Sequence, residues 1–435
     1  MKLSIGFSAV DLSDAVHRLP QAPDLSGYVA RMGPSTGIHD PPYVRALALR
    51  RGEKTLLLIV ADVLGIDRPM LRAIRAALAE RTGIPPAAIC VAATHTHSAP
   101  ATIALHGCGV PLPQWRTALT DAMVSAGAEA IGRLAPGRVG FGWADGSGLS
   151  RNRRPGDGPT DPRIGIARFD DASGRPIGVA VHFACHPVVL DHENRLISAD
   201  YPAALLQALE ARGLFALFVN GACGDINPAE RGGFEAASRM GRALADRVLS
   251  ALGRIETAGE PALSFRTAEA ELVYGSSRPD REALAKAAAA HRERHKALAA
   301  DPAQAIPARI EAAMAEWAAA MLARIEASPT AALAAGEPIE LQILGIGAWR
   351  LVPLPGEIFC ATGLAIDRGL GGNAWVLGYA NGNVGYVPTA ESFAHGGYEV
   401  DAAHRYYDRP AAFAPGEAER LARLAVALAA EGGQE

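Results

Sequence analysis

Thr94-His95-Thr96-His97-Ser98 follows directly after the short apolar run Ile89-Cys90-Val91-Ala92-Ala93. The apolar run predicts a buried strand. Side chains two positions apart in an extended chain point the same way, so we expect His95 and His97 to leave the strand end on one face. Imidazole is the commonest metal ligand in proteins. The pair therefore indicates either a metal site or two hydrogen-bonded histidines in a polar loop.

Strands and helices alternate on either side of this stretch. Before it, Asp67 and Pro69 predict the start of a helix that ends at Gly83, and after it a helix is expected from about Gln114 to Leu134. This alternation is typical of α/β proteins. Predicted hairpins pair 43–49 with 55–61, 164–169 with 177–185, and 339–344 with 348–352. The first forty residues are expected to form loops.

The composition restricts the classes of partner. The 435 residues carry a net charge of −4 with no basic stripe, which argues against nucleic-acid binding. Five scattered cysteines without a Cys-x-x-Cys pair favour a reducing compartment over a disulfide framework. The N-terminus does not read as a signal peptide, and no apolar run approaches the ~20 residues that span a bilayer. We therefore expect a cytoplasmic protein that does not insert into a membrane.

Residues 278–330 differ in composition from the rest of the chain. They are rich in Ala, Glu and Arg, and Asp301-Pro302 divides them into two predicted helices. An apolar stripe runs along the second helix at helical spacing, comprising Ile310, Met314, Trp317, Met321 and Ile325. We interpret the segment as a helical hairpin inserted into the sheet domain. The stripe would pack against that domain or against a second copy of the chain in a homo-oligomer.

Further polar clusters follow other predicted strands, where the sites of α/β sheets collect. Pro187 cannot continue a central strand, so His186 in Phe183-Ala184-Cys185-His186-Pro187 stands at a strand end. Another strand runs into Asn220-Gly221-Ala222-Cys223-Gly224-Asp225. Glu357 follows Pro355-Gly356 at the expected start of a helix, where it is either a ligand or an N-terminal helix charge.

Two other polar features have more than one interpretation. The loop Ser150-Arg151-Asn152-Arg153-Arg154 is either a solvated surface or a clamp for a substrate carbonyl or carboxylate. His182 lies within a strand and is expected to be a packing residue of the core. Asp62 closes a strand, where it would either orient a metal-bound histidine or cap a turn.

Several motifs, in this order, resemble the neutral/alkaline non-lysosomal ceramidase family. They are Thr94-His95-Thr96-His97-Ser98, Phe183-Ala184-Cys185-His186-Pro187 with Leu196-Ile197-Ser198-Ala199-Asp200, Asn220 to Asp225, Pro355-Gly356-Glu357 and Gly385-Tyr386-Val387-Pro388-Thr389. The resemblance covers nearly all of residues 1–435 apart from the helical insertion, but not the family's carboxy-terminal immunoglobulin-like domain. It implies a single α/β domain of stacked mixed sheets flanked by helices.

The resemblance also implies a site with one Zn²⁺ per chain. Its ligands would be His95, His186, Glu357 and Tyr386, a set of nitrogen and oxygen donors that suits zinc. His97 would face the substrate and, with Asp225 as the alternative, move the proton. The implied substrate contacts are Arg153, Tyr398 and Gly27, the last of these the weakest match.

One position departs from the family pattern. The family has Gly-Asp-x-Ser-Pro where this chain has Gly224-Asp225-Ile226-Asn227-Pro228, and an amide cannot act as the acyl-accepting nucleophile. We therefore expect a zinc-dependent hydrolase of an amide, ester or lactone bond that uses a metal-activated water. Arg153, Tyr386 or Asn227 would stabilise the oxyanion. The substrate would be a small molecule, more polar than ceramide. The alternative is a catalytically inactive zinc-binding protein with a ligand-binding or regulatory role.

Overall fold

The computed structural model describes residues 1–155, 158–327 and 333–431. Its central element is an eight-stranded mixed sheet. The strands, in spatial order, are β11 (Phe215–Asn220), β9 (Pro176–Phe183), β8 (Arg163–Asp171), β6 (Ala135–Asp145), β1 (Ser4–Asp11), β3 (Tyr43–Arg51), β4 (Lys54–Ala61) and β5 (Ile89–Ala93). Only the outermost pairs, β11 with β9 and β4 with β5, are parallel.

A second, four-stranded sheet packs against this one. It has the order β13 (Leu263–Val273), β14 (Gly336–Ile346), β15 (Trp349–Pro353) and β17 (Ala374–Leu377). Aromatic side chains fill the space between the two sheets. Phe141 stacks on Trp349 with ring centroids 4.9 Å apart, and His182 stacks on Trp375 at 5.4 Å. His182 is therefore a packing residue of the core, as its place within a strand predicted.

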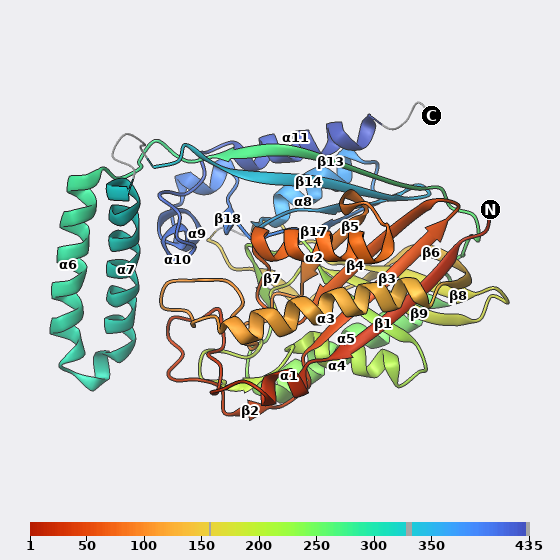
Figure 1. Cartoon of the computed structure of the whole chain (residues 1–435), viewed down its shortest axis with the longest axis horizontal. Coiled ribbons are helices and arrows are strands. Elements are labelled where there is room, and N and C mark those ends of the chain that lie inside the picture. Colours follow the sequence, from red (N-terminus) through yellow and green to blue (C-terminus); the bar gives the residue numbers. More distant parts are fainter. Residues whose placement is uncertain (156–157, 328–332, 432–435) are drawn as a thin grey trace.

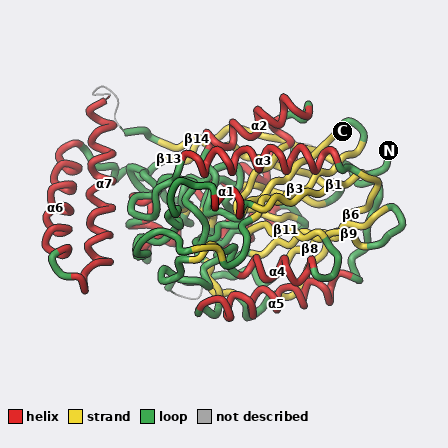
Figure 2. The backbone as a smooth tube through the Cα atoms, turned by 60° about the horizontal axis from the view of Figure 1, so that its bottom comes forward, coloured by secondary structure: helices red, strands yellow, loops and turns green. Residues whose placement is uncertain are grey.

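Helices cover the outer faces of the two sheets (Figures 1 and 2). The helices α3 (Pro113–Gly132), α4 (Tyr201–Glu210) and α5 (Gly233–Leu252) lie on the large sheet, and α8 (Cys360–Gly369) and α11 (Glu417–Ala430) lie on the small one. The α2 helix (Arg68–Thr82) packs beside α3. The layers follow the order helix, sheet, sheet, helix, and this arrangement confirms the predicted fold class of mixed sheets flanked by helices.

The ends of α2 show how local sequence sets an element. The Asp67 carboxylate accepts a hydrogen bond from the Met70 N–H at 2.9 Å, and Gly83 ends the helix in the left-handed region with φ +73°. A side-chain acceptor at the first position and a glycine after the last are the typical boundaries of a helix. Both boundaries are those that the sequence predicted.

Short elements complete the chain. Three two-stranded pairs are β2 (Gly37–Ile38) with β10 (Leu196–Ile197), β7 (Ser150–Asn152) with β12 (Ile226–Pro228), and β16 (Glu357–Ile358) with β18 (Tyr386–Val387). The short helices are α1 (Ser13–His17), α9 (Tyr398–Asp401) and α10 (Ala403–Tyr406), with 3₁₀ turns at Pro86–Ala88, Pro302–Gln304 and Ala390–Ala394.

Residues 278–330 contain two antiparallel helices, α6 (Arg281–Ala299) and α7 (Ala305–Ala327), at one end of the molecule (Figure 1). The apolar stripe of α7 packs against two different surfaces. Trp317 and Met321 pack with Leu284 of α6, whereas Met314 belongs to a cluster with the main domain. Residues 328–330 lie outside the described part of the chain.

Two predictions about elements were wrong. The first forty residues are not all loop, because β1 lies in the middle of the large sheet and pairs with β3 along its whole length. Its sequence Ser-Ile-Gly-Phe-Ser-Ala-Val-Asp alternates small polar with apolar residues too weakly to be recognised as a strand. Glu357 does not start a helix either; it lies in β16, and α8 begins three residues later.

The large sheet curls until its two edge strands meet. Asn220 at the end of β11 donates a hydrogen bond from Nδ2 to the carbonyl of Thr94, just after β5, at 3.0 Å. These strands are the first and last in the order of the sheet. The curl therefore brings the segment that follows β5 close to the segments that follow β9 and β11.

Candidate metal centre

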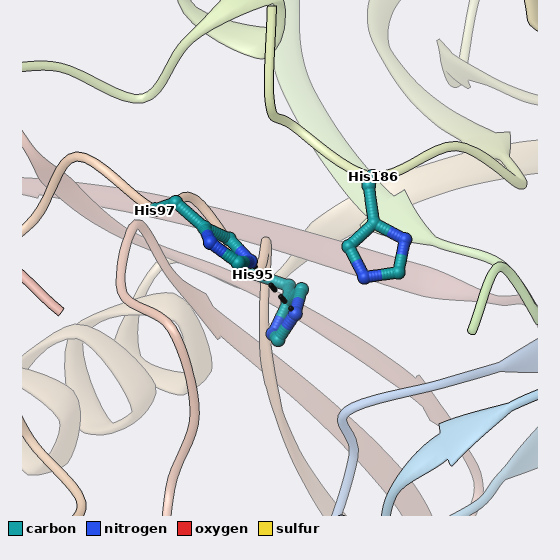
Figure 3. Close-up of side chains that lie close together, drawn as sticks. All are labelled: His95, His97 and His186. Atoms are coloured by element: carbon teal, nitrogen blue, oxygen red, sulfur yellow. Dashed lines mark hydrogen bonds between the residues drawn. The ribbon is translucent and has the colours of Figure 1, made fainter. Parts of the chain in front are cut away.

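Three histidines from two of these segments meet in a buried cluster. His95 and His97 follow β5, and His186 follows β9. One ring nitrogen of each lies within 4.8 Å of the others (Figure 3). The Nε2 atoms of His95 and His97 are 3.3 Å apart.

Backbone carbonyls fix the orientation of two of the rings. The Nδ1 atom of His95 lies 2.6 Å from the carbonyl oxygen of Leu64, and that of His186 lies 3.0 Å from the carbonyl oxygen of Ile226. A carbonyl can only accept, so each Nδ1 carries the proton and each Nε2 presents a lone pair to the centre of the cluster. Such contacts are the usual way in which proteins orient metal-binding histidines.

Glu357 provides the fourth donor. Its Oε2 atom lies 3.0 Å from Nε2 of His186 and 3.6 Å from Nε2 of His95. The other oxygen, Oε1, accepts a hydrogen bond from the Tyr407 hydroxyl. Tyr407 therefore leaves Oε2 free to face the imidazoles.

The charge states of these groups suit a cation. Burial lowers the pKa of His95 to about 3, so this imidazole is neutral at pH 7. Burial alone would raise the pKa of Glu357, but His95, His186 and Tyr407 outweigh it and lower the value to about 2. The cluster therefore combines the neutral imidazole of His95 with an ionised carboxylate, and both are in the protonation state that metal binding requires.

The spacing of the donors fits zinc. Zinc–nitrogen and zinc–oxygen distances of about 2.0–2.1 Å place neighbouring ligands of a tetrahedron about 3.3–3.4 Å apart. The two separations from Glu357 Oε2, 3.6 Å to His95 Nε2 and 3.0 Å to His186 Nε2, lie close to that edge length. Lone pairs facing one another at this range repel unless a cation or a proton lies between them. The donor set is therefore chemically suited to a zinc ion.

The sequence predicted that His95 and His97 share one face because the chain is extended there, and that reason was wrong. His95 has φ +67°, so the chain is not extended there, and β5 has already ended at Ala93. The two rings converge because the backbone turns sharply after the strand. Positive φ is uncommon for residues other than glycine and often marks a functional site.

Tyr386 lies next to Glu357. The two residues are register partners in the parallel pair β16–β18, so their side chains start from neighbouring backbone positions. The hydroxyl of Tyr386 accepts a hydrogen bond from Nη2 of Arg153 at 2.9 Å. Arg153 also donates from Nη1 to Oδ1 of Asn227 at 3.3 Å and from Nε to Glu399 at 2.8 Å. Arg153 thus connects Tyr386 with Asn227.

Asp225 has a different environment from the one expected of a proton shuttle. Its Oδ1 accepts from the backbone N–H of Cys360 at 2.8 Å, and its Oδ2 accepts from Nδ2 of Asn152 at 2.8 Å. Both oxygens are thus used in holding the loops together. Asp62 likewise bonds a backbone group, the N–H of Tyr43, at 2.9 Å.

Gly27 and Tyr28 border the outer side of His97. A Cβ atom on Gly27 would lie 2.4 Å from Nδ1 of His97, so only glycine leaves room for the ring. The ring of Tyr28 lies 4.8 Å from that of His97. Nδ1 of His97 is buried without a hydrogen-bond partner in the described chain. Tyr398, the other predicted pocket residue, is 46% exposed and lies 5.6 Å from the ring of Tyr386.

Sequence reasoning missed two tyrosines at the cluster. Tyr407 bonds Glu357, and Tyr379 stacks on His95 with ring centroids 3.7 Å apart. The apolar run Trp375 to Ala380 predicts a strand that includes Tyr379, whereas β17 ends at Leu377, so the strand end that would have marked this residue was missed. Tyr407 lies in a short turn after α10 and has no pattern that distinguishes it.

Comparison with known proteins identifies the family. The model of the N-terminal part of neutral/alkaline non-lysosomal ceramidases matches residues 4–238, more than half of the chain. The chain belongs to this family. Over 129 residues it is 33% identical to the neutral ceramidase of Pseudomonas aeruginosa, an alignment that covers 26% of this chain and only 19% of that protein.

Solved structures show the same fold as this ceramidase-family chain. The crystal structure of the Pseudomonas aeruginosa neutral ceramidase superimposes with a TM-score of 0.73 at 20% identity, covering 99% of this chain and 74% of that one. A ceramidase complexed with C2 gives a TM-score of 0.72 at 20% identity, covering 99% and 75%. No helix in the described ranges is long and apolar enough to cross a membrane.

Proposed function

We propose that this member of the ceramidase family is a zinc-dependent hydrolase of an amide, ester or lactone bond. The observation that carries the proposal is the convergence of two imidazoles on one carboxylate oxygen: Glu357 Oε2 lies 3.0 Å from His186 Nε2 and 3.6 Å from His95 Nε2. Family membership supports the hydrolase class.

One Zn²⁺ per chain would be held by His95, His186 and Glu357, with Tyr386 as the fourth ligand. Bound there, the ion would polarise a substrate carbonyl and lower the pKa of a water molecule towards 7. The carbonyl contacts at Nδ1 of both histidines and the Tyr407 contact to Glu357 support this ligand set, because they aim the free donor atoms inwards.

His97 is the best candidate for moving a proton. Its Nε2 lies 3.3 Å from His95, at the edge of the proposed centre, and no protein group bonds its Nδ1 in the described chain. Its tautomer is therefore free to change, unlike those of His95 and His186. General acid–base catalysis requires such freedom together with hydrogen-bond reach.

Arg153 and Asn227 would stabilise the oxyanion. Oδ1 of Asn227 accepts from Arg153, which leaves the Nδ2 amide hydrogens to donate. The three nitrogens of Arg153 each make one contact in the described chain, so one hydrogen remains on each terminal nitrogen. Those hydrogens suit a carbonyl or carboxylate oxygen, and we therefore propose a smaller, more polar substrate than ceramide.

A substrate screen with metal control tests the proposal. The full chain is assayed on a panel of short-chain amides, esters and lactones, first with zinc, then after removal of zinc by a chelator, then after zinc is restored. We expect turnover that chelation abolishes and zinc recovers. Turnover that persists in the chelated, metal-free protein would contradict the proposal.

Asn227 favours a second candidate, a zinc-binding protein without catalytic activity. The residue replaces the serine of the family motif, and it cannot be acylated. The variant Asn227→Ser separates the two candidates. If the wild type is inert on the whole panel and the serine variant gains turnover while both bind one zinc, the non-catalytic role is supported. Wild-type turnover excludes that role.

A further inference from the structure

The segment that follows β17 joins the two edges of the large sheet. Leu377 forms an isolated bridge with Gly221, just after β11, and Ala380 forms one with Ala92 in β5. Two more hydrogen bonds connect Asn381 with Val91 of β5, one from the Asn381 N–H at 2.7 Å and one to its side chain at 3.1 Å. This segment therefore closes the gap between β11 and β5, directly beneath the histidine cluster.

Tyr379 lies in the middle of this segment, in a conformation that is uncommon for residues other than glycine. Its φ is +55°, and its side chain is completely buried. Its N–H donates to the carbonyl of Gly356, which precedes Glu357, and its carbonyl accepts from the N–H of Ala93, two residues before His95. The backbone of Tyr379 thus connects the segments that carry two of the proposed ligands.

The ring of Tyr379 lies flat against His95. The two rings are 3.7 Å apart between centroids with an angle of 14° between their planes. Besides the contacts of its Nε2 with His97 and Glu357, the ring of His95 is held by the bond from Nδ1 to Leu64 and by this stacking over its face. A hydrogen bond at one nitrogen leaves the ring free to rotate about that bond, whereas stacking over its face prevents the rotation.

The hydroxyl of Tyr379 also lies near His186, the third proposed ligand. It lies 3.1 Å from Sγ of Cys223 and 3.5 Å from Nε2 of His186. Cys223 in turn contacts Oδ1 of Asn220 at 3.3 Å, and Asn220 bonds the carbonyl of Thr94. At 3.5 Å the contact with His186 is longer than an ordinary hydrogen bond, so Cys223 is the main partner of the hydroxyl.

We propose that Tyr379 is a positioning residue of the metal centre, whose ring holds His95 in the orientation that binds the ion. This inference rests on the proposed zinc site and deepens it. Groups that orient metal ligands without touching the metal contribute about 10–100-fold to metal affinity. The stacked ring supplies this contribution on the face of His95, where no hydrogen bond could.

Zinc affinity of the full chain tests the inference, measured by competition with a chromophoric chelator. We expect Tyr379→Leu to weaken zinc binding by about 10–100-fold, because the flat surface under His95 is lost. Tyr379→Phe keeps that surface and should bind zinc nearly as tightly as the wild type. The visible spectrum of the Co²⁺-substituted protein should change in Tyr379→Leu and stay unchanged in Tyr379→Phe, since it reports ligand geometry rather than stability.

Two further variants complete the design. Tyr274→Phe removes the hydroxyl of a buried residue just after β13, bonded to Glu337, and should leave zinc affinity and the Co²⁺ spectrum unchanged. Tyr379→Asn removes the ring with a residue that tolerates positive φ, and it replaces the leucine variant should that variant fail to fold.

The outcomes separate this inference from the proposed function. Wild-type affinity and spectrum in a folded variant without the ring would overturn the positioning role alone. Equal losses in Tyr379→Phe and Tyr379→Leu would also overturn it, because the hydroxyl rather than the ring would then carry the effect. A wild-type chain that binds no zinc would overturn the proposed metal centre itself.

Discussion

At the scale of single residues, His95 and His97 differ in what holds their rings. His95 is fixed by Leu64 and Tyr379, whereas His97 packs against Gly27 and Tyr28 and has an unpartnered Nδ1 in the described chain. A fixed tautomer suits a metal ligand, and a free one suits a group that gains and loses a proton. The two histidines of one motif therefore have separable roles.

Alanine variants separate these roles. We expect His95→Ala to lose both zinc and activity. His97→Ala should keep zinc and lose turnover by about 10²–10⁴-fold, the usual contribution of an acid–base group. Zinc content and steady-state kinetics of both variants provide the measurement. A loss of zinc from His97→Ala as complete as that from His95→Ala would make His97 a ligand instead.

Gly27→Ala tests how closely His97 must be placed. The added methyl group would lie 2.4 Å from Nδ1 of His97, at a backbone φ of +98°. We expect the ring to shift, turnover to fall and zinc to remain, with a stability loss of about 1–2 kcal/mol from backbone strain. Gly174→Ala is the matched control, since Gly174 has φ +88° and nothing within 4 Å of an added Cβ. Equal turnover in both variants would exclude a positioning role for Gly27.

At the scale of elements, α7 supports the loops around His97. Arg309 donates from Nε to the carbonyl of Val29 at 2.8 Å and from Nη2 to the carbonyl of Gly107 at 3.2 Å. Val29 follows Tyr28, and Gly107 lies in the loop after the histidine motif. Met314 of the same helix clusters with Tyr386 and Tyr407. The inserted hairpin therefore contributes to the wall beside the proposed site.

Removing the Arg309 contacts should loosen these loops. We expect Arg309→Met to speed amide hydrogen exchange in residues 104–111 and to raise KM, with zinc content unchanged. Each lost bond is worth about 1 kcal/mol. Arg281→Met, which removes an exposed ion pair of α6 with Glu326, is the control and should change neither. Unchanged exchange in Arg309→Met would show that α7 does not support the loops.

At the scale of the whole molecule, the sequence predicted individual helices and strands better than the contacts between distant segments. Cap residues such as Asp67 and Gly83 set the ends of α2 locally, so these were predictable. The strand β1 was missed because its weak pattern becomes a strand only when β3 and β6 pair with it. The contact of Asn220 with Thr94 depends on the curl of the sheet, and no local pattern records it.

The same reasoning applies to the site. The family resemblance pointed to His95, His186 and Glu357, which the structure brings together from three distant segments. Tyr379 and Tyr407 could not be predicted, since each acts through a contact to one of those side chains. The left-handed turn at His95 was hidden as well, because the preceding residues read as a regular strand.

Asp200 links the stability of the whole molecule to pH. Burial raises its pKa to about 7, although the N–H groups of Leu190, Tyr201 and Val189 oppose the shift. The folded protein therefore binds this proton more tightly than the unfolded chain does. The resulting stabilisation is complete below about pH 4 and is lost as the pH rises through about 7.

Urea unfolding between pH 5 and pH 8 measures this effect. We expect the free energy of unfolding to fall more steeply with rising pH in the wild type than in Asp200→Asn, which cannot titrate. Asparagine has the shape of aspartate and keeps one side-chain oxygen that can accept from the neighbouring N–H groups. Parallel curves for the two proteins would show that Asp200 does not titrate in this range.

The central claim is that three distant side chains bind one zinc ion, and metal content tests it most directly. Full-length chain equilibrated with zinc and then freed of excess ion should contain one zinc per chain by mass spectrometry. Glu357→Ala and His186→Ala should contain none, and Glu230→Ala, which changes an exposed glutamate of an ion pair, should match the wild type. Zinc-free wild type, or full zinc content in Glu357→Ala and His186→Ala, would contradict the account.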